Sequence, residues 1–191
     1  MNELEIIRSQ LALEQSHAAE VANACAAAFG STSTPASEDA IALFREACVS
    51  YLVWVLARFE ERDQTLSELL LSRQSQANGP AAAGARQLGN LISQSGTSRE
   101  ALARLESALA AGSSEAARAS WQEFARFFNS SWASRRVALE SALAQHWSVA
   151  DWRTVCAIDA DSILDERRRF ARVVAQLPAG IELRRTASPG A

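Results

Sequence analysis

The sequence predicts an all-α protein: an antiparallel up-down four-helix bundle with a broken third helix and an additional C-terminal helix. The composition favours helices, because alanine and leucine are abundant while glycine and proline supply only 8 and 4 of the 191 residues. Several long segments carry apolar residues at spacings of three and four, which is the period of one helix face. Short polar connections join these segments, and short connections favour antiparallel neighbours in a bundle.

The longest predicted helix covers residues 37–73, with no glycine or proline in its interior. Its apolar residues follow one face, except in the turn where Arg62 and Asp63 stand. A charge at a core-facing position must be paired, ligated or functional, because burying it alone is costly. The apolar face consists of Ile41, Phe44, Cys48, Leu52, Val55, Phe59, Leu66 and Leu70.

The third element is predicted to be broken. Four glycines and one proline lie between residues 75 and 96, which predicts a loop with a short helix near residues 81–93. Thr97 and Glu100 have the spacing of a capping box. We expect them to open a second short helix that ends at Gly112.

The remaining helices are bounded by recognisable start and stop signals. Gly30 ends the first of them, since glycine is common just after a helix. Ser148 and Asp151 form a capping box at the start of the last one, and Pro178 ends it. These helices are predicted at about residues 2–29, 113–146 and 149–176.

Length and composition limit the classes of protein. We expect one domain over residues 1–177 and a disordered tail over residues 178–191. The net charge is −3 and the basic residues are spread along the chain, so we expect no nucleic-acid partner. No apolar run approaches the roughly 20 residues that span a bilayer, and no signal-peptide core is present, so we expect no membrane partner and a bacterial-type cytoplasmic protein. The three cysteines, which are far apart, indicate buried thiols in a reducing compartment.

Each long helix has one polar interruption in its apolar face. In an antiparallel bundle these interruptions could meet in one buried polar layer, where arginine is suited to pairing with carboxylates. Alternatively, the helix phases differ by one residue and the side chains extend to water. The interruptions are Glu14, Arg62 with Asp63, Arg135 with Ser131, and Asp159.

Metal and catalytic motifs are incomplete. Glu14 and His17 have the spacing by which di-iron bundles place a carboxylate and an imidazole on one helix face, but only one copy is present. His146, the second histidine, is interpreted as a helix-end residue. Asp159, Asp161 and Asp165 lack the glycine of a calcium loop and are interpreted as a solvated face. Nucleotide-binding and hydrolase motifs are absent from the sequence, so we expect no enzyme activity.

Four segments are similar to parts of a known family. They are Leu13–His17, Arg58–Asp63 followed by Leu66–Leu70, Ser131–Leu139 and His146–Trp152. Over Glu3–Arg172 the layout resembles the hemerythrin-like (HHE cation-binding) bundles. The resemblance implies histidine ligands where this chain has Arg58 and Ser131. It also implies glutamate ligands where this chain has Arg62 and Arg135.

These departures lead to our first hypothesis, a non-catalytic hemerythrin-like bundle without a cofactor. It would act as a small-ligand-binding or regulatory interaction module, for a small molecule or a protein partner that the sequence leaves open. We expect the binding residues or buried polar layer to comprise Glu14, His17, Arg58, Arg62, Ser131, Trp132, Arg135 and Asp159.

Two alternatives remain open at this point. One is an iron protein of the same family that handles oxygen or nitric oxide through an atypical ligand set. Its candidate metal ligands are Glu14, His17, Glu61, Asp63 and Asp159. The other is a plain interaction protein, a homodimer formed through the aromatic stripe of residues 121–132, because Trp and Phe are enriched in interfaces.

Overall fold

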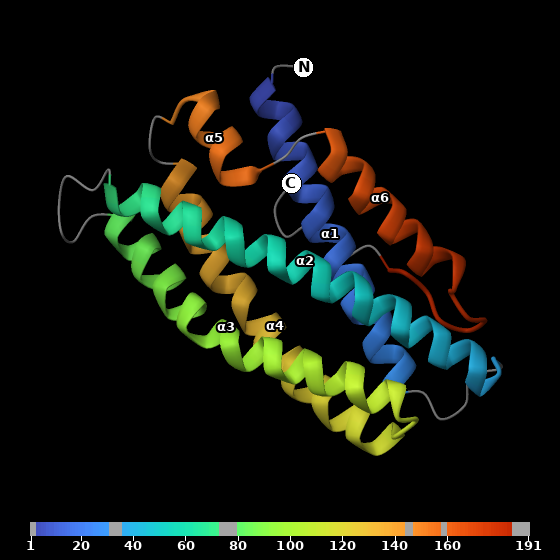
Figure 1. Cartoon of the computed structure of the whole chain (residues 1–191). Coiled ribbons are helices and arrows are strands. Elements are labelled where there is room, and N and C mark those ends of the chain that lie inside the picture. The colour runs from blue at the N-terminus through green and yellow to red at the C-terminus, as the bar shows by residue number, and fades with distance from the viewer. Residues whose placement is uncertain (1–2, 31–35, 73–79, 144–146, 158–159, 185–191) are drawn as a thin grey trace.

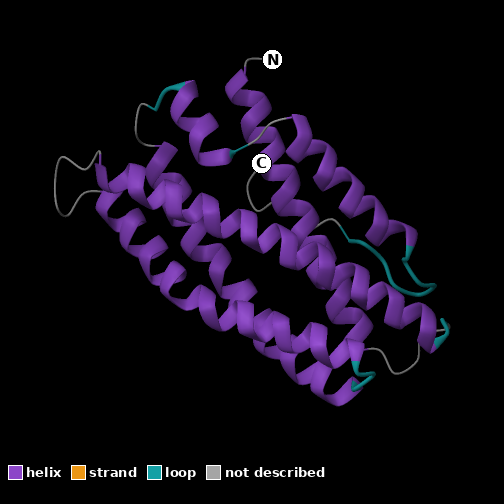
Figure 2. Ribbon diagram, in the orientation of Figure 1, coloured by secondary structure: helices purple, strands orange, loops and turns teal. Residues whose placement is uncertain are grey.

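The computed structural model describes residues 3–30, 36–72, 80–143, 147–157 and 160–184. Within this part of the chain the secondary structure is helical and contains no strand, which confirms the predicted all-α class (Figure 2). The helices are α1 (Glu3–Gly30), α2 (Glu38–Ser72), α3 (Pro80–Ala110), α4 (Ser114–Leu143), α5 (Val149–Cys156) and α6 (Ala160–Ala175).

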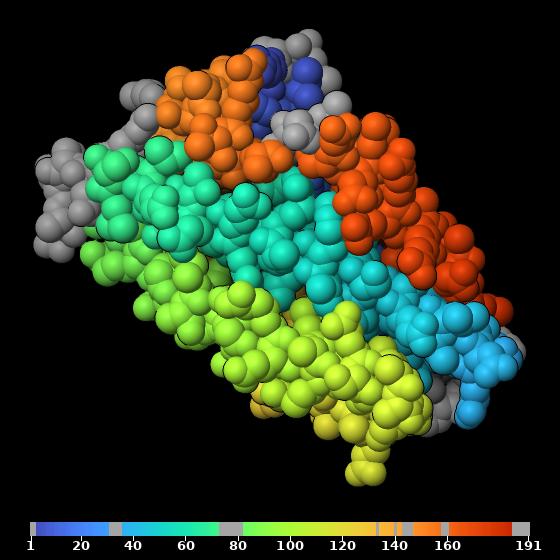
Figure 3. All heavy atoms as spheres, viewed as in Figure 1, coloured from blue at the N-terminus to red at the C-terminus, as the bar shows by residue number. Residues whose placement is uncertain are grey.

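Helix α2 lies at the centre of the molecule and packs against each of the other five helices described (Figure 1). Helix α3 packs along both α2 and α4, while α5 and α6 cover α1 and α2 on the opposite side. The space-filling view shows α6 lying directly against α2 (Figure 3). The predicted long helix at residues 37–73 is therefore the element around which the others are arranged.

The buried apolar side chains form two clusters. The large core cluster includes Phe44, Leu52 and Phe124, and the small core cluster includes Leu70 and Leu88. Helices α1 to α4 each contribute to both clusters. Each of these helices therefore passes from one apolar region into the other about midway along its length.

The predicted break in the third element is wrong, because α3 is continuous from Pro80 to Ala110. A Cβ atom added at Gly89 or Gly96 would meet no atom within 4 Å. These two glycines therefore lower the helix propensity of α3 and are not needed for close packing against a neighbouring helix. At Gly84 an added Cβ would lie 2.9 Å from the Cβ of Ser141, so glycine permits close packing of α3 on α4 there. Packing of the leucines of α3 into both clusters outweighs the weak local propensity.

The predicted single C-terminal helix is also wrong, because it is divided into α5 and α6. The capping box of Ser148 and Asp151 is present, as predicted. Helix α5 then ends at Cys156, and the next residue, Ala157, has φ 46° and lies in the left-handed region that disfavours residues other than glycine. The break allows Trp152 and Cys156 to enter the small core cluster while α6 packs farther along α1 and α2.

The first residues of the predicted tail lie against the core. Ile181 is buried within the large core cluster, and Leu183 packs against that cluster. For residues 178–184 the structure therefore differs from the predicted disorder, while residues 185–191 lie outside the described chain.

Helix α2 is long and apolar enough to cross a membrane by length and composition alone, with a mean hydropathy of 1.7 over its most apolar 18 residues. The core helix of a soluble protein passes the same test, and 44% of that window is buried here. This is weak evidence for a membrane span, and the cytoplasmic location stays a prediction.

Candidate functional site

A set of polar residues, all buried except the partly buried Arg58, separates the two core clusters, and we call Glu14, Arg58, Arg62, Asp63, Ser131 and Arg135 the polar layer. On α2, Arg62 and Asp63 lie between Phe59 of the large cluster and Leu66 of the small one. On α1 and α4, the layer residues likewise lie between the residues that enter the two clusters. Arg62 is only 8% exposed, so its side chain does not extend to water as the alternative interpretation predicts.

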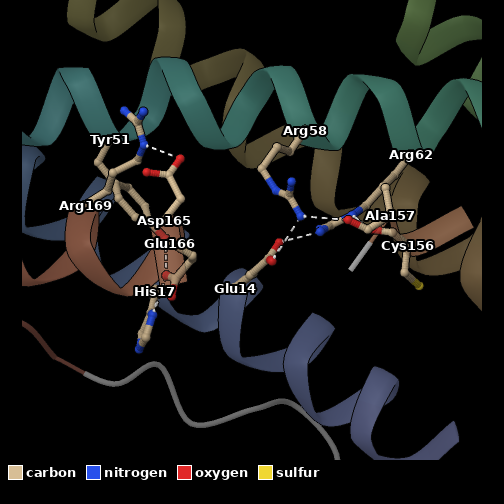
Figure 4. A network of polar contacts seen from close by, with 10 residues as sticks. All are labelled: Glu14, His17, Tyr51, Arg58, Arg62, Cys156, Ala157, Asp165, Glu166 and Arg169. Atoms are coloured by element: carbon tan, nitrogen blue, oxygen red, sulfur yellow. Dashed lines mark hydrogen bonds and ion pairs between the residues drawn. The ribbon is translucent and has the colours of Figure 1, made fainter. Parts of the chain in front are cut away.

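Glu14 is fully buried and is held by two arginines from α2 (Figure 4). Its Oε2 lies 2.6 Å from Nη2 of Arg62, and its Oε1 lies 3.4 Å from Nη2 of Arg58. The contact between Arg62 and Glu14 is an ion pair, but its geometry is not that of a hydrogen bond. Two cations on one buried carboxylate compensate for its removal from water.

The same arginines also bind the end of α5. Nε of Arg62 donates to the backbone oxygen of Cys156 at 2.9 Å, and Nη2 of Arg58 donates to that of Ala157 at 3.5 Å (Figure 4). The carbonyl groups at a helix C-terminus carry partial negative charge and attract cations. The two arginines thus connect α1, α2 and α5 around one carboxylate.

A second buried pair joins α2 to α4. Nη2 of Arg135 lies 2.8 Å from Oδ2 of Asp63, and its Nη1 donates to the hydroxyl of Ser131 at 2.6 Å. The guanidinium lies 5.0 Å from the ring centre of Phe59 and 6.0 Å from that of Trp132, so aromatic faces surround the cation. Burial raises the pKa of Asp63, and the charge of Arg135 offsets this only in part.

His17 lies in a different cluster from the polar layer. Its Nδ1 is 2.7 Å from Oε1 of Glu166 on α6, and the hydroxyl of Tyr51 donates to the same oxygen at 3.0 Å (Figure 4). The His17 ring stacks on Phe170 with ring centres 3.7 Å apart. Glu166 is fully buried, so this cluster fixes α6 to α1 and α2.

Sequence reasoning missed Glu166 although a signal was present. It stands between Ile163 and Phe170 at spacings of three and four, in the middle of the apolar face of α6. It is therefore the same kind of polar interruption as Glu14. The interpretation as a solvated face covers only the neighbouring Asp161 and Asp165 and does not include Glu166.

Tyr51 provides a spectroscopic test of this cluster, because it is the one tyrosine in the sequence. Burial, followed by the negative charge of Glu166, raises its pKa well above the ordinary value of 10.0. We expect the folded protein to show almost no tyrosinate absorbance at about pH 11, where an exposed tyrosine is about nine-tenths ionised. Since the folded phenol holds its proton more tightly than the unfolded one, stability should fall as the pH rises above about 10.

Tyrosinate absorbance in the ultraviolet, measured as a function of pH for the native chain and for the urea-unfolded chain as control, tests this prediction. The variant Glu166→Gln keeps an acceptor for Tyr51 but removes the charge, so its tyrosine should ionise at lower pH than in the parent. Native and unfolded chains that titrate together would contradict the placement of Tyr51.

The remaining predicted site residues are dispersed. Trp132 is partly buried, 5.7 Å from the ring centre of Phe59, and so lies beside the polar layer. Glu61 is exposed, on another face of α2 from Arg62. Asp159 and His146 lie outside the described residues.

The four candidate metal ligands that the structure describes are not gathered at one point. Glu14 and Asp63 belong to separate ion pairs, and His17 contacts Glu166. Over the described chain, no three His, Cys, Asp or Glu side chains are close enough to hold a metal ion. Cys156 is a free thiol whose pKa burial raises to about 11, so at neutral pH it is protonated.

The aromatic stripe of α4 mostly faces the protein's own core. Trp121, Phe124 and Phe128 are each no more than 4% exposed and belong to the large core cluster. A homodimer, if one forms, would therefore have to use another surface.

Comparison with protein-family models, with curated proteins and with solved structures finds no match to this chain.

Proposed function

We propose that the chain is a non-catalytic helical module of hemerythrin-like shape, in which arginine–carboxylate pairs stand where that family binds a metal. It acts by binding a small ligand or a partner rather than by catalysis. The observation that carries the proposal is the fully buried Glu14 between Arg58 and Arg62. The resemblance implies a histidine and a glutamate ligand at these two arginine positions.

The proposal includes an antiparallel up-down bundle of α1 to α4, to which α5 and α6 are added. The two core clusters support this arrangement. Helices α1 and α3 reach the small cluster with their N-terminal halves, whereas α2 and α4 reach it with their C-terminal halves. The reversal of direction between successive long helices in Figure 1 agrees with this.

Charge balance explains how arginine could replace a cation. In a di-iron bundle the metal ions neutralise carboxylates that point inward. Here Glu14 and Asp63 are neutralised by guanidinium groups, which stay protonated at any physiological pH. A metal ion at Glu14 would have to displace Arg62 and leave that cation buried without a partner, which is costly.

The alternative is a di-iron protein with an atypical ligand set. It requires Glu14, His17, Glu61, Asp63 and Asp159 to converge. The exposure of Glu61 and the contact of His17 with Glu166 weigh against that set. Asp159 lies outside the described residues, so iron binding stays a prediction that needs a direct test.

Thermal unfolding provides such a test. We expect the Tm of the protein to be the same with a chelator and after anaerobic addition of Fe(II), because the polar layer needs no cation. Iron bound to the folded state at a hundredfold excess over its Kd would add about 2.7 kcal/mol, which raises Tm by about 5–10 °C for a chain of this size. A rise of that size would favour the iron-protein alternative.

A further inference from the structure

A cavity of about 580 Å³ lies away from the polar layer, where α1 and α3 end and α2 and α4 begin. Its size falls within the range of about 300–1,000 Å³ that is typical of small-molecule sites. Phe29, Ile41 and Leu109 give it an apolar wall. Arg45 of α2 and Arg118 of α4 also line it.

The guanidinium of Arg45 is held in place by its surroundings. Its Nε donates to the backbone oxygen of Ala28 at 3.2 Å, and its Cζ lies 4.6 Å from the ring centre of Phe29. Burial lowers the pKa of Arg45 most; Cys25 opposes this shift, and the positive charge of Arg118 adds to it. Two cations thus line one cavity and repel each other.

The two arginines of the cavity have no close carboxylate partner in the part of the chain that the structure describes, although two carboxylates and two arginines line it. Within the described residues, neither Arg45 nor Arg118 has a carboxylate oxygen within the 4.0 Å of an ion pair. Glu38 and Asp39, both exposed, also line the cavity, and Glu38 acts on Arg45 from a longer distance. An anion with one charge would join the two arginines, whereas one with several charges would be repelled by these carboxylates.

We propose that this cavity binds a small organic monoanion, a carboxylate with an apolar body. The carboxylate lies between Arg45 and Arg118, and guanidinium groups are well suited to bind it. The apolar body lies against Phe29, Ile41 and Leu109. This inference rests on the ligand-binding part of the proposed function, and it names the site and the class of ligand.

Calorimetric titration of the full chain with sodium octanoate tests the proposal. We expect saturable binding of one octanoate per chain, and weaker binding of 1-octanol, which has the same apolar body without the charge. The variant Arg118→Gln should raise the Kd for octanoate by about two- to fivefold, the effect of losing one exposed charge-assisted contact. Arg118 is exposed and makes no hydrogen bond or ion pair with the described residues, so this variant should fold.

The matched control is Arg126→Gln, on the same helix. Arg126 is also exposed, donates among the described residues only to the backbone oxygen of Gln122, and does not line the cavity. It should leave the Kd for octanoate unchanged. Absence of octanoate binding, equal binding of 1-octanol, or equal effects of the two substitutions would each overturn the proposal. The metal content of the protein tests the proposed function, and it is measured independently of these binding experiments.

Discussion

Replacing Arg62 by methionine is expected to lower the free energy of unfolding by about 3–5 kcal/mol, the usual cost of removing one partner from a buried ion pair. Glu14 is fully buried and would keep only Arg58, whose Nη2 is 3.4 Å away. The backbone oxygen of Cys156 would also lose its donor. Urea unfolding followed by circular dichroism measures the change.

Arg104→Met is the matched control. Its ion pair with Glu123 has the same 2.6 Å separation as that of Arg62 with Glu14, but both side chains are well exposed. Since exposed pairs contribute little, this variant should unfold almost as the parent does. The double variant Glu14→Leu with Arg62→Met should recover part of the lost stability, because it removes the buried carboxylate together with its closest cation, while the partly exposed Arg58 keeps its contact with the backbone oxygen of Ala157. Equal stability of Arg62→Met and Arg104→Met would show that Arg62 is not buried against Glu14.

The second large effect is expected for Arg135→Met, again about 3–5 kcal/mol near neutral pH. Asp63 would remain buried without its closest cation. Burial already raises the pKa of Asp63, and loss of Arg135 would raise it further. Because a folded-state pKa above the unfolded value favours folding at low pH and loses that contribution as the pH rises, the cost of this variant should shrink in acid.

Urea unfolding of parent and variant at about pH 7 and about pH 5 tests this pH dependence. The variant Ser131→Ala serves as control, since it removes a hydroxyl contact of Arg135 and leaves the ion pair with Asp63 intact. Its cost should be smaller and independent of pH over this interval. A cost for Arg135→Met that grows as the pH falls would contradict the assigned pairing.

The central helix and the polar interruptions on it follow from the sequence for a simple physical reason. Apolar residues at spacings of three and four define one face of this helix, and no glycine or proline interrupts its phase, so a pair such as Arg62 and Asp63 within that face is visible by spacing alone. The structure places both residues between the two core clusters. Which carboxylate pairs with which arginine depends on how the helices pack, and spacing along one helix does not contain that information.

Other elements were not predictable because tertiary packing overrides local preference. The glycines of α3 predict a loop, but the helix is continuous because its leucines fill both clusters. The division between α5 and α6 occurs at Ala157, a residue that gives no turn signal. Likewise, the partner of His17 is Glu166, 149 positions later in the chain, so only the packing of α6 on α1 brings them together.

The iron content of the purified protein, measured before and after anaerobic reconstitution with Fe(II), tests the central claim most directly. A polar layer held together by arginine predicts no stoichiometric metal in either sample and no visible spectrum in air. Two irons per chain, with the near-ultraviolet absorption of an oxo bridge, would contradict the replacement of a metal by arginine and identify an iron protein instead.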